Sequence, residues 1–125
     1  MRLEIPVEEF AEKEIVQMQT STGDVQTYEH WGRISFEVDG EQGKLTIYSN
    51  EHGLFMPFTD ATSGKETYGA GRYLEPEQIG ADKVFVDFNV AYSPYCAYNE
   101  MYSCPIPPIE NRLKVSIRAG EKNFK

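Results

Sequence analysis

Strict alternation of apolar and polar residues is the feature that most restricts how this chain can fold. Between residues 25 and 38, one face of the alternating pattern consists of Tyr28, Ile34, Phe36 and Val38. Between residues 83 and 92, the same pattern gives a face of Val84, Val86, Phe88 and Val90. Side chains of a β-strand point alternately to opposite faces, so a period of two predicts strands with one buried face. The chain is therefore expected to be all-β.

Short turn signals divide these strands. The strings Thr22-Gly23-Asp24 and Asp39-Gly40 favour tight connections between antiparallel neighbours. Gly32, next to Trp31, suits a β-bulge or a barrel bend. The spacing predicts an antiparallel sandwich or partly closed barrel of seven to eight strands. Residues 1–125 are expected to form a single domain, because a chain of this length seldom divides.

Two segments interrupt the strand pattern. Residues Pro6 to Lys13 are predicted to form one or two helical turns, because a proline can open a helix and the glutamates after it complement the helix N-terminus. Ser93 to Arg112 contains four prolines and both cysteines, and it is predicted to be a long ordered loop. Tyrosines crowd the same half of the chain. They could line a ligand pocket, but most are expected to anchor this loop through hydrogen bonds to its carbonyl groups.

The excess of acidic residues limits the possible partners. Twenty acidic against twelve basic residues give a formal charge of −8. Nucleic acids and anionic membranes draw affinity from cationic side chains, so neither is an expected partner. Residues 1–4 do not resemble a secretory leader, and the longest apolar run, Leu54 to Phe58, is too short for a membrane span. A cytoplasmic location is expected.

Ordered strings in the second half of the chain are specific enough to suggest a family. They begin with PFTDATSGKETY at residues 57–68 and GRYL at residues 71–74. They continue with Asp87-Phe88-Asn89, Ala91-Tyr92, Pro94, Cys96-Ala97-Tyr98, Cys104-Pro105, Pro107-Pro108, Glu110-Asn111-Arg112-Leu113 and Ala119-Gly120-Glu121-Lys122. From Phe55 to Lys122 the chain resembles the prokaryotic family called domain of unknown function 1684. The resemblance implies a compact β domain and no particular activity.

The same strings contain the candidate site. Its proposed members are Asp60, Arg72, Tyr73, Asp87, Asn89, Tyr92, Tyr98, Glu110 and Asn111. Carboxylates that converge with an arginine could bind a polar molecule or a cation, or could act as acid and base. A structural interpretation is preferred for several of them. Asp60 would cap a turn together with Thr62, and a buried Asp87 would pair with Arg72.

Cys96 and Cys104 are a candidate thiol pair. Seven residues separate them, which is wider than the usual spacing of paired zinc ligands, and nothing in the sequence places His30 or His52 beside them. No metal and no cofactor are therefore expected. The pair is interpreted as two small buried apolar residues, with a local disulfide or thiol chemistry as the alternative.

Together these features favour a small non-enzymatic binding or structural module. A small-molecule ligand would occupy a polar–aromatic pocket under the loop of residues 93–112. Two alternatives stay open. One is a hydrolase or isomerase that uses a carboxylate acid/base pair, and the other is a thiol-dependent function through Cys96 and Cys104.

Overall fold

Strands account for almost all the regular structure of this protein. The computed structural model describes residues 2–20, 23–38, 40–51, 53–63, 71–80, 82–92, 105–114 and 117. The strands are β1 (Arg2–Glu9), β2 (Ile15–Gln19), β3 (Val25–Val38), β4 (Glu41–Asn50), β5 (Gly53–Phe58), β6 (Arg72–Leu74), β7 (Glu77–Ile79) and β8 (Lys83–Asp87). Two short 3-10 turns are η1 (Phe88–Val90) and η3 (Ile109–Asn111). Within these ranges no helix is long and apolar enough to cross a membrane. The predicted all-β class is confirmed.

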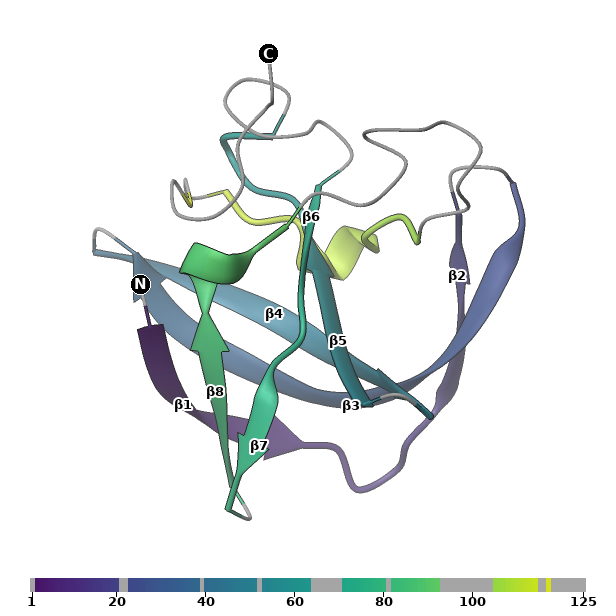
Figure 1. Ribbon diagram of the computed structural model, residues 1–125, viewed down its shortest axis with the longest axis horizontal. Helices are drawn as coiled ribbons and strands as arrows, with labels where there is room; N and C mark the ends of the chain where they lie inside the picture. Colours follow the sequence, from purple (N-terminus) through teal and green to yellow (C-terminus); the bar gives the residue numbers. More distant parts are fainter. Residues whose placement is uncertain are drawn as a thin grey trace.

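The strands form one antiparallel sheet that curls into a half-barrel (Figure 1). Their order is β6-β5-β4-β3-β1-β8-β7, and β2 pairs with β3 beside this path. β6 and β7 lie at opposite ends of the order, yet only Glu75 and Pro76 separate them in the chain. One bent segment therefore joins the two edges of the sheet. The backbone of Tyr73 in β6 also exchanges two hydrogen bonds, of 2.8 and 3.1 Å, with the backbone of Tyr92, which follows β8 and η1. These bonds bring the two edges of the sheet together. Of the two predicted architectures, the partly closed barrel is the one observed.

The two faces of the sheet carry separate hydrophobic clusters. The main core includes Ile34, Phe36, Leu45, Ile47, Met56, Phe58, Val84, Val86 and Phe88. A smaller cluster contains Met18, Tyr28 and Tyr48, with Val16 and Phe55 packed against it. On β4, Ile47 belongs to the main core and Tyr48 to the smaller cluster. Because consecutive strand residues point to opposite faces, the smaller cluster lies on the outer face of the half-barrel.

A β-bulge in β3 explains how one strand supplies both clusters. His30 pairs with Tyr48, and the next pair is Gly32 with Ile47, so Trp31 is the extra residue. An inserted residue reverses which face later side chains occupy. The bulge predicted at this position is confirmed. The prediction that Tyr28 shares one face with Ile34 is wrong, because the bulge lies between them.

The predicted helical segment at residues 6–13 is also wrong. Its first half belongs to β1, which pairs with β8 through Arg2–Pro6 and with β3 through Val7–Glu9. Val7 donates its N–H to Asp82 on the β8 side, so the nitrogen of Pro6 points away from β8. Pairing with β3 begins only at Val7. The proline therefore occupies a strand position where no hydrogen bond from its nitrogen is needed.

Candidate functional site

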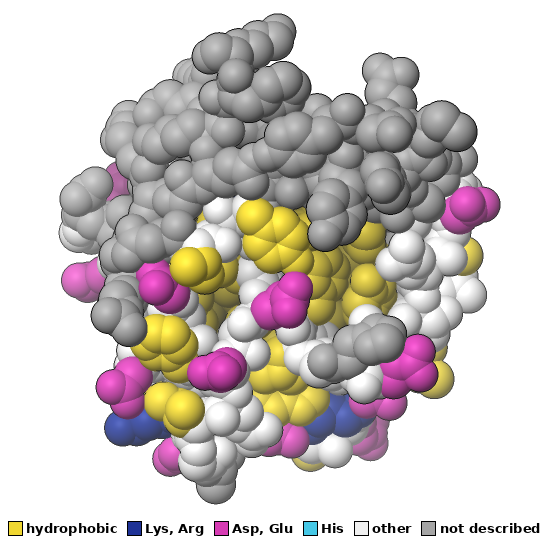
Figure 2. Space-filling model, in the orientation of Figure 1, with side chains coloured by type: hydrophobic (Ala, Val, Ile, Leu, Met, Phe, Trp, Pro, Cys, Tyr) yellow, Lys and Arg dark blue, Asp and Glu magenta, His cyan; other side chains and the backbone are white. Residues whose placement is uncertain are grey.

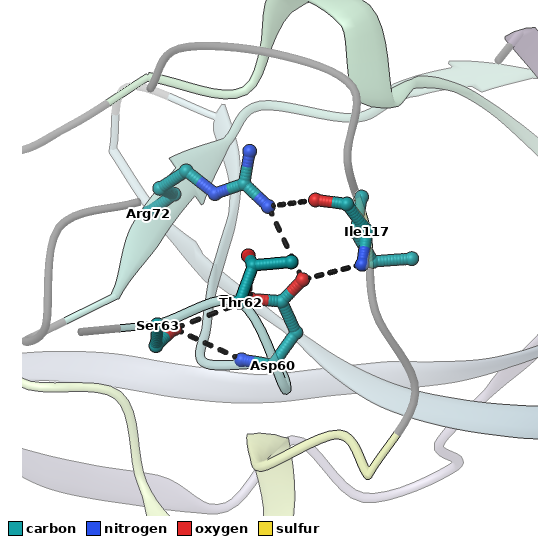
Figure 3. Close-up of polar contacts among 5 residues, drawn as sticks. All are labelled: Asp60, Thr62, Ser63, Arg72 and Ile117. Atoms are coloured by element: carbon teal, nitrogen blue, oxygen red, sulfur yellow. Dashed lines mark hydrogen bonds and ion pairs between the residues drawn. The ribbon is translucent and has the colours of Figure 1, made fainter. Parts of the chain in front are cut away.

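Asp60 and Arg72 form a fully buried ion pair at the end of β5 (Figure 3). Phe58 pairs with Arg72 in the β5–β6 ladder, which brings the arginine next to the residues that follow β5. Arg72 Nη2 lies 3.3 Å from Asp60 Oδ2 and also donates to the Ile117 carbonyl at 2.6 Å. Asp60 Oδ2 accepts the Ile117 N–H at 2.5 Å, and Oδ1 accepts the Thr62 hydroxyl at 2.8 Å. The pair thus ties three separate chain segments together.

The surroundings of this pair indicate a structural role. Burial lowers the pKa of the Arg72 guanidinium, and the nearby Asp60 carboxylate offsets this effect. The guanidinium also lies 5.3 Å from the centre of the Phe58 ring, a cation–π contact. The predicted turn around Asp60 and Thr62 is confirmed. The prediction paired Arg72 with Asp87 only if Asp87 is buried, and the structure leaves Asp87 half-buried. Asp60 is the carboxylate at Arg72, whereas Asp87 lies in β8, opposite Arg2 of β1.

Asn111 replaces missing ladder hydrogen bonds between β4 and β5. Direct pairing of these strands covers Tyr48–Asn50 and stops before Thr46. The Asn111 side chain accepts the Thr46 N–H at 2.7 Å and donates to the carbonyls of Thr46 at 2.9 Å and Pro57 at 2.8 Å. It is completely buried. This candidate pocket residue therefore holds η3 against the sheet and satisfies backbone groups that would otherwise be buried without partners.

Glu110 is the candidate carboxylate that meets a histidine. Its Oε1 accepts the hydroxyl of Tyr48 and lies 3.2 Å from His30 Nε2. Burial, together with Glu110, raises the pKa of Tyr48 above its ordinary value. The His30 ring stacks on Phe10 with 4.6 Å between ring centres. His30 and Tyr48 are not among the site residues predicted from the sequence. The two pair across β3 and β4, but His30 lies 80 residues from Glu110 in the chain, and no local pattern links them.

Four aromatic rings form a row that includes the smaller cluster. The aromatic row is Tyr28, Phe55, Tyr73 and Tyr92, with successive ring centres 5.4, 4.8 and 5.7 Å apart. It crosses β3, β5 and β6. Figure 2 shows hydrophobic side chains gathered in a hollow in the middle of the viewed face, with acidic side chains among them. The row is buried at Tyr28 and Tyr73 and opens to solvent at Tyr92, which is 36% exposed.

Residues 105–113, here called the crossing, run from the end of β2 to the end of β5 (Figure 1). Ile106 donates its N–H to the Gln19 carbonyl at 2.8 Å, and Leu113 donates to the Thr59 carbonyl at 2.8 Å. The hydroxyl of Tyr73 donates to the Pro105 carbonyl. Tyrosine anchoring of the loop, as predicted, is thus observed at Tyr73. The hydroxyl of Tyr92 instead donates to Glu75 Oε1 at 2.7 Å.

Asp87 borders a different cavity. This pocket has a volume of about 180 Å³ and is lined by Leu74, Glu75, Pro76, Glu77, Phe85, Val86, Asp87 and Val90. The candidate residues therefore divide among the ion pair, the Asn111 contacts, the Glu110 contacts, the aromatic row and this pocket. Tyr98, Cys96 and Cys104 lie outside the described residues, as does the side chain of Asn89, whose backbone forms part of η1. Among the described residues, no group of three His, Cys, Asp or Glu side chains could hold a metal ion.

Fold and site together define a small all-β half-barrel, braced by buried polar contacts and carrying an aromatic row on its outer face. The chain belongs to the family described as protein of unknown function (DUF1684), whose family model matches residues 1–122. It is also similar to an uncharacterized protein of Haloarcula marismortui, known from a solution NMR structure. The two chains are 38% identical with a TM-score of 0.75, over 97% of this chain and 70% of that one. Among curated proteins, no match was found.

Proposed function

We propose that this protein is a non-enzymatic binding module that holds a small organic cation against the aromatic row. The observation that carries this proposal is the row itself, four adjoining rings with a carboxylate, Glu75, bonded to its exposed end at Tyr92. The face of an aromatic ring is electron-rich and attracts cations that lie within about 6 Å of its centre. The formal charge of −8 adds a long-range attraction for cations.

The rings are held in place before any ligand arrives. Tyr73 is fixed by its hydrogen bond to Pro105, and Tyr92 by its bond to Glu75. Each hydroxyl is thus engaged at the edge of its ring. Groups that are already ordered lose little entropy on binding, so such a row favours affinity. Arg33, 5.6 Å from the centre of the Phe10 ring, is an example of a cation–ring contact elsewhere in the same chain.

Choline and its uncharged analogue, in which a quaternary carbon replaces the nitrogen, separate attraction to charge from simple hydrophobic binding. We expect choline to shift the NMR signals of the Tyr73 and Tyr92 rings in a saturable way, and the analogue to bind about fivefold more weakly, since cation–π contacts contribute on the order of 1 kcal/mol. Equal binding of the two compounds would mean that the aromatic row binds them by hydrophobic contact alone, without attraction to the positive charge. No shift with either at about 10 mM would contradict the proposal, because that concentration detects even millimolar affinity.

Two single variants test whether choline binds at the aromatic row. Tyr92→Leu removes a ring, and Glu75→Gln removes the charge while it keeps an acceptor for the Tyr92 hydroxyl. Each is expected to weaken choline binding by about tenfold, the equivalent of one moderate cation–π or charge contact. Glu37→Gln, an exposed carboxylate on β3, is the matched control and should bind choline like the wild-type chain. A loss of affinity in the control as large as in Glu75→Gln would point to net charge rather than to a site.

The contact between Glu110 and His30 favours one second candidate, a hydrolase or isomerase with this pair as acid and base. Their 3.2 Å separation allows proton transfer between them, and both side chains are partly exposed to solvent. Turnover of small ester or sugar substrates that disappears in both His30→Gln and Glu110→Gln would support it. Turnover that is unchanged in either variant would rule out this second candidate.

For Cys96 and Cys104 the predicted alternatives stay open, a local disulfide or thiol chemistry. Mass measurement of the intact chain would test whether the two cysteines are oxidised or free.

A further inference from the structure

β2 presents one edge that the sheet leaves open. It pairs with β3 through Ile15–Gln19 and lies beside the path of the other strands. His30 donates its N–H to the Glu14 carbonyl, and Thr20 donates to the Asp24 carbonyl. In an antiparallel ladder, hydrogen-bonded residues alternate with residues that point away. The backbone groups of Ile15, Gln17 and Gln19 therefore point outward, away from β3.

One end of this edge already accepts another chain segment. Gln19 receives the N–H of Ile106 at 2.8 Å, and Thr20 forms a bridge with Pro105. The next outward groups along the strand belong to Gln17 and Ile15, and among the described strands none pairs with them. Both side chains are exposed, Ile15 to 72%. This part of the edge is accessible to an incoming strand.

β2 also lacks the residues that usually protect an open edge. Charged side chains and prolines discourage edge-to-edge pairing. β2 reads Ile-Val-Gln-Met-Gln and contains neither. β7, at one end of the strand order, carries Glu77 and follows Pro76. At Thr46 the Asn111 side chain covers the edge of β4. The uncharged edge of β2 thus differs from these two edges.

We propose that β2 pairs antiparallel with β2 of a second copy of this chain, about a two-fold axis at Val16. In this register Ile15 lies opposite Gln17 of the second copy, so the open groups of both residues are used and Gln19 stays bonded to Ile106. Glu14 would face Met18 of the second copy, and the pairing ends there, because Ile106 and Pro105 already occupy the edge at Gln19 and Thr20. No two acidic residues oppose each other, which matters for a chain with a formal charge of −8. A closed two-fold interface of this kind ends at the dimer.

Sedimentation velocity of the full chain over a concentration series tests the proposal. We expect a monomer–dimer equilibrium that becomes visible by about 1 mM, because a few edge hydrogen bonds give weak association. Gln17→Pro removes an outward N–H and leaves the hydrogen bonds to β3 in place, so it should give a folded monomer. Gln17→Ala keeps that N–H and is the matched control, expected to dimerise like the wild-type chain. If Gln17→Pro fails to fold, Ile15→Lys places a charge on an exposed side chain and should also abolish the dimer.

Three results would overturn the proposal. One is a wild-type chain that stays monomeric throughout the series. Another is a dimer that persists unchanged in both Gln17→Pro and Ile15→Lys. The third is assembly beyond the dimer, which a closed interface does not allow. Amide hydrogen exchange adds a separate readout, since protection of Ile15 and Gln17 should rise with protein concentration. Protection independent of concentration would mean that the chain covers this edge itself, which also contradicts the proposal.

Discussion

Replacement of Asp60 by asparagine removes one charge from the buried ion pair and changes little else. The asparagine oxygen can keep the position of Oδ2, where it still accepts from Arg72 and from the Ile117 N–H. Its amide nitrogen then faces the hydroxyls of Thr62 and Ser63, which at present donate to Oδ1 at 2.8 and 3.2 Å. A hydroxyl can rotate and accept instead. The hydrogen-bond geometry therefore survives, and the substitution isolates the contribution of the charge.

The expected loss of stability follows from the charge left behind. Removal of one member of a buried ion pair typically costs about 3–5 kcal/mol, because its partner is then buried without compensation. Arg72 would keep its 2.6 Å hydrogen bond to the Ile117 carbonyl and its contact with the Phe58 ring. These contacts place the expected loss at the lower end of the 3–5 kcal/mol range, at about 3 kcal/mol. The whole free energy of unfolding of a typical domain is roughly 5–15 kcal/mol, so this loss would be large.

Urea denaturation followed by circular dichroism measures this cost directly. The midpoint should fall while the slope m stays the same, because both chains expose the same surface. Asp82→Asn, at an exposed carboxylate in the turn after β7, is the matched control and should change stability by less than about 0.5 kcal/mol. The double variant Asp60→Asn/Arg72→Met should recover much of the loss, since it removes the stranded charge. A cost below about 1 kcal/mol for Asp60→Asn would refute the argument that this pair braces the fold.

Three further substitutions test the other contacts. Asn111→Ala removes three buried hydrogen bonds and should cost about 3 kcal/mol in the same urea assay, whereas a cost under about 1 kcal/mol would show that water replaces the amide. The raised pKa of Tyr48 means that the folded chain keeps a proton that the unfolded chain loses, so stability should fall as pH rises above the ordinary tyrosine value of about 10. Tyr48→Phe should reduce that fall by up to about 1.4 kcal/mol per pH unit, and an unchanged slope would contradict the assignment. Gly71→Ala would place a methyl group 2.5 Å from the Phe58 backbone oxygen, at a φ of 106°, and should lower the free energy of unfolding by at least about 2 kcal/mol. Gly80→Ala is the control, at a φ of 72° with open space around it, and should lower that free energy by less.

The sequence predicts the strands better than it predicts which side chains share a face. Alternation in residues 25–38 predicts β3 over its full length, because burial of one face imposes a period of two. The strand predicted at residues 83–92 is correct only as far as Asp87, where η1 begins, and Val90 is exposed rather than on the buried face. Gly32 signals a bulge, but the position of the extra residue, Trp31, depends on how β4 pairs with β3. The sequence wrongly predicts helical turns at residues 6–13, since the effect of Pro6 on a strand depends on which neighbouring strand its nitrogen faces. These are properties of the sheet rather than of a single segment.

The candidate site shows the same division between local and long-range information. The turn at Asp60 is local, and its residues lie within a few positions of one another, so it is visible in the sequence. The choice between Asp60 and Asp87 as the partner of Arg72 depends on strand order, which the sequence does not specify. The contacts of Glu110 with His30 and Tyr48 join residues 80 and 62 positions apart. Only the path of the crossing brings these residues together.

The position of β1 has a consequence for how the chain folds as it is synthesised. β1 bonds to β3 on one side and to β8, about eighty positions later, on the other. Ribosomes add residues at about 5–20 per second, so β1 would wait several seconds with one edge bare before Asp87 emerges. During that interval, cellular factors that recognise exposed strands could bind it.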